Sequence, residues 1–207
     1  QFNLTSKYIK EELATMENGL QISFSETQLP AKAMERKEQE LLIKTIYAAH
    51  NGVYRMSADM DDLVETSNNL ACVNVKNGKT QINCLTRSSV ESSKMDLANA
   101  LKSAFELAGF EVTFAGSYPG WKPNMQSSIL KTMTAVYENM FQSKAEVVAC
   151  HAGLECGILG ANYPAMEMIS FGPTITGAHS PDEKASISSS QKFWKYFLEV
   201  LKNIPEK

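Results

Sequence analysis

The sequence predicts an α/β protein made of two parts, an α+β part followed by an α/β part. In residues 1–116 the apolar pattern indicates helix, strand, helix, strand, strand, helix and strand in turn. In residues 117–207 single helices and strands alternate, which is typical of a parallel sheet covered by helices. Between the two parts, the stretch "GSYPGWKPN" carries prolines and glycines that mark a boundary or hinge.

The first part opens with a helix that Gly19 ends. Residues 19–26 then alternate apolar and polar side chains, which predicts a half-buried strand. A second helix follows Pro30 and ends near Gly52. Together these elements precede the most regular segment of the chain.

Residues 63–88 predict a β-hairpin, because Asn77-Gly78 tolerates the two positive φ angles of a type I′ turn. Counting outward from this turn places Asn68 opposite Arg87 at the far end of the hairpin. An arginine and an asparagine side by side can hold a carboxylate through parallel hydrogen bonds. The alternative is an exposed arginine on a solvated face, and spacing alone leaves both possibilities open.

An amphipathic helix and a strand are expected next, over residues 92–110 and 111–116. The second part predicts helices and strands over these ranges: helix 127–141, strand 145–152, a short helix after Gly153, strand 166–172 and helix 181–201. For the last helix, Ser180 is the expected N-cap and Pro181 the first helical residue.

Composition indicates an ordinary globular protein and excludes several functions. The 207 residues are 43% hydrophobic and 21% charged, with a net charge of −3. This balance, without a block of basic residues, argues against nucleic-acid binding, and no apolar run reaches the roughly 20 residues of a membrane helix. The four cysteines lie in apolar segments without a C-x-x-C pair, so we expect reduced core residues in a cytosolic protein. The missing initiator methionine fits either a missing upstream part or processing.

Two histidines are the best candidates for chemistry. His151 and His179 each follow a predicted strand of the second part, where open α/β sheets bind their ligands. A structural histidine and a ligand remain equally good explanations for each. No H-E-x-x-H helix, G-x-S-x-G elbow or glycine-rich phosphate loop accompanies them.

Six motifs together resemble one known family. They are "NGVYRMS", "LVETSNNLACV", "INCLTRSS", "YPGWKPN", "HAGLECG" and "SFGPTITGAHSPDE", in this order along nearly the whole chain. They closely resemble the second half of the aminoacyl-histidine dipeptidases, di-zinc metallopeptidases related to aminoacylase and carnosinase. The resemblance implies a C-terminal fragment of a longer enzyme. Residues 1–116 would be the latter part of a lid and dimerisation domain, and residues 117–207 the closing segment of the catalytic domain.

The resemblance also implies roles for single residues. His179 matches the last metal ligand, and Arg87 matches a lid arginine that holds the C-terminal carboxylate of the substrate. His151, Gly153 and Glu155 match a loop on the substrate side of the metals. The general base and the other ligands of the family lie outside this sequence, so we expect no catalytic residue in it.

The function implied is hydrolysis of dipeptides such as Xaa-His by a water molecule that two zinc ions activate. The family further implies a cytoplasmic homodimer formed through the lid, and a fragment that is inactive alone. Two alternatives remain. One is a non-catalytic binding module that keeps the peptidase fold, and the other is a related carboxypeptidase or aminoacylase.

Overall fold

The structure is a computed structural model that describes residues 1–151 and 154–204. The chain forms two compact units, Gln1–Gln39 and Glu40–Lys207. The elements around the candidate site belong to the second unit. The domain boundary that we predict between residues 116 and 117 falls within this unit and stays a prediction.

The first unit contains α1 (Phe2–Glu12), where the ring of Phe2 lies 5.3 Å from that of Phe24. The strand expected over residues 19–26 is absent, so that prediction is wrong. A strand needs a neighbour for its backbone N–H and C=O groups, and this segment has no paired neighbour. The Phe24 side chain is 75% exposed, so burial does not hold the segment extended either.

The second unit is built on an antiparallel sheet of order β1-β2-β3. Its strands are β1 (Gly52–Met56), β2 (Val64–Lys76) and β3 (Lys79–Ser88), and α2 (Arg36–Ala48) precedes them. Asn77 and Gly78 join β2 to β3 with φ angles of 55° and 74°. Both angles are positive, as a type I′ turn requires, so the predicted hairpin is confirmed.

The register of this hairpin changes half-way along. Near the turn, Val75 pairs with Thr80 as expected, but a bulge between Leu70 and Cys72 inserts Ala71 as an extra residue of β2. Beyond the bulge every residue of β2 pairs one position differently, and its side chain changes face. Ser67, and not Asn68, therefore lies opposite Arg87, so the predicted Asn68–Arg87 pair is wrong.

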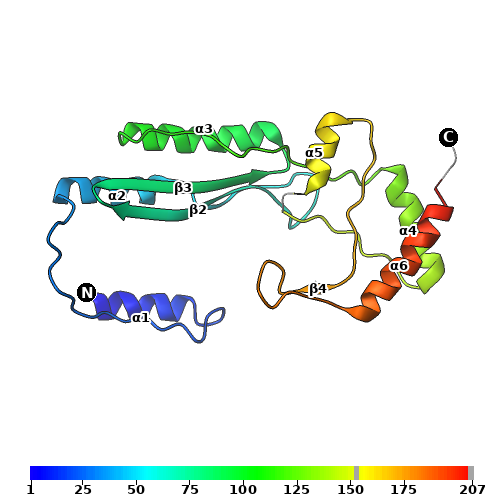
Figure 1. Ribbon diagram of the computed structural model, residues 1–207, viewed down its shortest axis with the longest axis horizontal. Helices are drawn as coiled ribbons and strands as arrows, with labels where there is room; N and C mark the ends of the chain where they lie inside the picture. The colour runs from blue at the N-terminus through cyan, green and yellow to red at the C-terminus, as the bar shows by residue number, and fades with distance from the viewer. Residues whose placement is uncertain (152–153, 205–207) are drawn as a thin grey trace. The chain divides into compact units, whose positions relative to one another are not determined.

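Helix α3 (Glu91–Leu107) covers one face of the hairpin (Figure 1). Its buried side chains Leu97, Leu101 and Phe105 form a core with Ala49. Partly buried apolar residues of the sheet and of the following segment pack against this core: Leu70, Ile82, Phe110 and Val112. Residues 111–116 contribute to the core without forming the expected strand.

The rest of the unit is mostly helical, with α4 (Ser128–Phe141), α5 (Glu155–Asn162) and α6 (Ile187–Lys202). Helices α4 and α6 pack together through Met133, Val136 and Val200 (Figure 1). The predicted start of the last helix is wrong, because Ser186 caps α6 by accepting a hydrogen bond from the N–H of Ser189.

The two parallel strands expected over residues 145–152 and 166–172 are not formed within the described residues. The pairing found there is a short antiparallel one, between β4 (Ile175–Thr176) and β5 (Lys184–Ala185). Parallel strands need partners on either side, and the described part of this chain offers none. The cysteines are free, as expected, but Cys72, Cys84 and Cys150 are exposed, so their placement in the core is wrong. No helix of the described residues combines the length and apolar character needed to cross a bilayer.

Leu97→Ala is expected to lower the free energy of unfolding by about 2–5 kcal/mol, because the Leu97 side chain is fully buried and its removal leaves a cavity. The matched control on the same helix is Leu107→Ala, whose side chain is 91% exposed; a change within about 0.5 kcal/mol is expected. Urea unfolding followed by circular dichroism measures both. Equal losses would contradict the position of this core.

Candidate functional site

Arg87 and His151, two of the residues singled out in the sequence, line the same cavity of about 650 Å³. The cavity is bounded by β3, α3 and residues 110–121, and it reaches Leu154 just before α5. It therefore joins the sheet to the segment that carries the "HAGLECG" motif. A volume of this order suits a small ligand.

Ser67 connects the two predicted residues. It lies directly opposite Arg87 in the antiparallel pair, so both side chains stand on the same face of the sheet. Its Oγ forms a 2.7 Å hydrogen bond with Nε2 of His151. The guanidinium of Arg87 and the hydroxyl of Ser67 thus lie side by side on one face of the sheet, and the hydroxyl binds the imidazole of His151.

The surroundings keep His151 neutral. Burial lowers the pKa of the imidazole from its usual value, and the positive charge of Arg87 lowers that pKa further. The backbone carbonyl of Val64 acts in the opposite direction and raises the pKa by a hydrogen bond. Burial is the largest of the three effects, so the neutral ring predominates at neutral pH.

Asn68 takes no part in this site. Its side chain is only 2% exposed and lies on the opposite face, where its amide donates to the carbonyl of His50 and its Oδ1 accepts from Thr86. Both hydrogen bonds hold the amide inside the protein. It cannot share a carboxylate with Arg87.

The structure does not gather the other predicted residues around Arg87. Glu155 is the exposed first residue of α5, where the helix dipole stabilises a carboxylate. His179 lies in the exposed turn between β4 and β5, has a φ of 64°, and donates its backbone N–H to the carboxylate of Glu183. Gly153 lies outside the described residues.

A complete metal site is not assembled by the described residues, which contain no group of three or more His, Cys, Asp and Glu side chains that could hold an ion. The exposed imidazole of His179 suits a zinc ion as a single ligand. Among the described residues, His179 therefore supplies one ligand of a zinc site and not the complete set. Any further ligands would have to come from elsewhere.

Close backbone contacts at Gly120 and Gly157, here called the joint, fix the segment beside the cavity. A Cβ atom on Gly120 would lie 2.3 Å from the carbonyl oxygen of Ser88, and one on Gly157 would lie 2.2 Å from that of Pro119. Residues 119–120 therefore touch the end of β3 on one side and α5 on the other. The ammonium of Lys94, a buried residue of α3, holds the same segment through 3.0 Å bonds to the Ser117 hydroxyl and the Tyr118 carbonyl.

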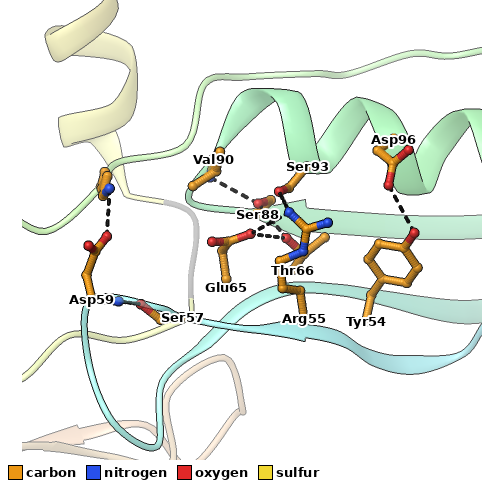
Figure 2. Close-up of polar contacts among 11 residues, drawn as sticks. Tyr54, Arg55, Ser57, Asp59, Glu65, Thr66, Ser88, Val90, Ser93 and Asp96 are labelled. Carbon is orange, nitrogen blue, oxygen red and sulfur yellow. Dashed lines mark hydrogen bonds and ion pairs between the residues drawn. The ribbon is translucent and has the colours of Figure 1, made fainter.

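A polar network ties the start of α3 to β1 and β2 (Figure 2). Arg55 donates to Ser93 of α3 at 2.8 Å, and the buried Thr66 shares a 2.8 Å hydrogen bond with Ser88. The hydroxyl of Ser88 also accepts from the N–H of Val90, directly before α3. Ser88 follows Arg87 at the end of β3 and contacts Gly120. This network therefore holds β3, with its Arg87 side chain, against the joint.

Known proteins are similar to this chain in sequence and in structure. The model of the peptidase family M20/M25/M40 matches residues 11–203. The chain belongs to this family. It is 37% identical over 205 residues to the cytosol non-specific dipeptidase of Escherichia coli (strain K12). The aligned region covers 99% of this chain and 42% of that protein.

Solved structures agree. The aminoacylhistidine dipeptidase of Vibrio alginolyticus matches with a TM-score of 0.85 and 38% identity, over 100% of this chain and 42% of that chain. The aminopeptidase PepT of Bacillus cereus ATCC 10987 matches with a TM-score of 0.62 over 80% of this chain and 44% of that chain; at 15% identity it shows the fold alone. The resemblance to the dipeptidase family is confirmed, and this M20 family chain spans less than half the length of these relatives.

Sequence reasoning missed Ser67, Lys94 and the contacts of the two glycines. Ser67 carries no signal of its own, since its place opposite Arg87 depends on the bulge. Gly120 and Gly157 stand inside the quoted motifs "YPGWKPN" and "HAGLECG". A glycine at such a place signals a close backbone approach, so those two could have been found.

Gly120→Ala is expected to lower the free energy of unfolding by about 1–3 kcal/mol, because its Cβ would collide with backbone atoms of Ser88 and Ser89. Gly172→Ala is the control, since a Cβ there meets no atom within 4 Å; it is expected to be neutral or slightly stabilising. Thermal unfolding compares the two. A neutral Gly120→Ala would show that the joint is loose.

Proposed function

We propose that this chain is part of a metal-dependent dipeptidase and supplies the clamp for the substrate's C-terminal carboxylate. The observation that carries the proposal is the position of Arg87, opposite Ser67 and beside His151 on the cavity wall. Membership of a peptidase family supports the chemistry. The names of the two nearly 40% identical relatives support dipeptides, Xaa-His among them, as substrates.

The clamp works by geometry as much as by charge. A guanidinium presents parallel N–H groups that match the two oxygens of a carboxylate. Arg87 lies on β3 directly opposite Ser67, which contacts His151, so the carboxylate would be bound beside His151. Binding one end of a dipeptide in this way orients its peptide bond for attack. On this proposal His151, Gly153 and Glu155 contact the substrate.

His179 is the residue that we propose as a metal ligand. When bound, zinc supplies polarisation of the peptide carbonyl and a water molecule of lowered pKa. The remaining ligands and the general base would come from the portion of the relatives that this chain does not cover. His179 would hold an ion at the edge of the site, while Arg87 holds the far end of the substrate.

Location and assembly follow from the same proposal. The Escherichia coli relative is named a cytosol enzyme, and we propose the same compartment for this protein. We also propose a homodimer formed through residues 1–116, with a dipeptide as the small-molecule partner.

The full-length enzyme, meaning this chain joined to the portion that its relatives have and it does not cover, is expected to hydrolyse Xaa-His dipeptides and to lose this activity to a chelator. The 207-residue chain alone is expected to show no turnover, because a catalytic zinc needs about three protein ligands. Release of free histidine measures both.

Three outcomes would contradict this expectation. Turnover by the chain alone that survives a chelator would exclude the division of the site between two portions. A full-length protein that binds dipeptides without hydrolysing them would support the binding module. Faster hydrolysis of acyl-amino acids than of dipeptides would support an aminoacylase or carboxypeptidase.

Arg87→Lys in the full-length enzyme is expected to lower kcat/KM for a dipeptide by roughly ten- to a hundred-fold, the equivalent of about 1.5–3 kcal/mol for a charge-assisted hydrogen bond. A lysine keeps the charge but cannot reproduce the two parallel N–H bonds. The control is the dipeptide amide, which lacks the carboxylate and should lose little in the variant. An equal loss on acid and amide would mean that Arg87 is not the clamp.

A further inference from the structure

Ser67 joins the two residues that the proposed clamp uses, Arg87 and His151, without being charged itself. We propose that Ser67 is a positioning residue, whose hydroxyl donates to Nε2 of His151, holds the ring in its Nδ1–H form and fixes it beside Arg87. The effect on substrate binding rests on the proposed function. The tautomer of the His151 ring does not depend on that function.

The geometry supports a fixed arrangement. The Oγ–Nε2 distance of 2.7 Å is that of a well-formed hydrogen bond. Ser67 and Arg87 are opposite residues of an antiparallel pair, so their backbones are held by the hydrogen bonds of the ladder. An imidazole bonded to Ser67 therefore has a defined position relative to the Arg87 side chain.

The hydrogen-bond inventory of the ring favours one tautomer. The backbone of Val64 raises the pKa of His151, which is the effect of a carbonyl that accepts from the ring. A neutral imidazole has one N–H, and a serine hydroxyl can donate as well as accept. Nε2 faces the hydroxyl at 2.7 Å, and the proposal assigns the proton to Nδ1, so that Nε2 accepts from Ser67. Burial and Arg87 both lower the pKa of His151, which supports the neutral ring.

A fixed neutral imidazole would give the site a definite charge. Of Arg87 and His151, Arg87 would then be the one with a full positive charge, and a monoanionic carboxylate is its matched ligand. A ring freed from Ser67 could turn, take either tautomer and leave the Arg87 side chain without a neighbour in a fixed place. We therefore expect loss of Ser67 to weaken the binding of the carboxylate and not of the rest of the substrate.

Nitrogen-15 NMR of the His151 ring in the 207-residue chain tests the tautomer without any activity. The wild type is expected to show the nitrogen signals of a single Nδ1–H form at neutral pH, and Ser67→Ala those of a mixture of both forms. Ser67→Thr, which keeps the hydroxyl, should resemble the wild type, as should the control Asn74→Ala on the same strand. Unchanged His151 signals in Ser67→Ala would overturn the proposal.

Kinetics of the full-length enzyme test the effect on the clamp. Ser67→Ala is expected to lower kcat/KM for a dipeptide about two- to ten-fold, the loss of one neutral hydrogen bond, with a smaller loss for the dipeptide amide and recovery in Ser67→Thr. Equal losses on both substrates would overturn the positioning role. If the full-length enzyme cleaves no dipeptide, the proposed function fails, while the nitrogen signals still decide whether Ser67 sets the state of the ring.

Discussion

The extra residue in β2, Ala71, decides which side chain stands opposite Arg87. The turn at Asn77-Gly78 fixes one end of the hairpin, and the bulge shifts the pairing of the β2 residues that lie farther from the turn by one position. Because side chains alternate between faces, this single insertion exchanges two polar residues. Asn68 turns toward the helix side, where His50 and Thr86 satisfy its amide, and Ser67 turns toward His151. The hydrogen bonds on both faces of the sheet depend on it.

The second half of the site reaches the sheet through the joint at Gly120. Ser67 and His151 are 84 positions apart in sequence, and the chain between them leaves the sheet, forms α3 and passes the joint. Backbone contact at Gly120 and at Gly157 leaves no room for side chains, so the strand end and α5 are held at fixed separation. Lys94 adds a buried cation that satisfies groups of the same segment. Close packing is what brings a loop of the second part to a strand of the first.

Local signals in the sequence predicted the hairpin turn, helix α3 and the position of α4, because each depends on residues near one another. The strands expected over residues 19–26 and 166–172 failed for one reason, namely that alternation or apolar character does not supply a neighbouring strand. For the site, the family resemblance pointed to Arg87 and His151, and the structure brings both to one cavity. Ser67 could not be predicted, since a bulge has no local signature strong enough to move a register by one residue.

The electrostatics of this cluster link its parts to the ligand that we propose. Arg87 lowers the pKa of His151 because two positive charges so close repel each other. A substrate carboxylate bound to Arg87 would neutralise much of that charge, so this contribution to the lowered pKa would weaken on binding. By linkage, protonation of His151 and binding of a carboxylate favour each other. Burial, the larger effect, acts in the opposite direction and would grow as substrate excludes water. The ring can therefore stay neutral through the binding step only if burial outweighs the lost repulsion, and a hydroxyl donor at Nε2 stabilises that neutral form.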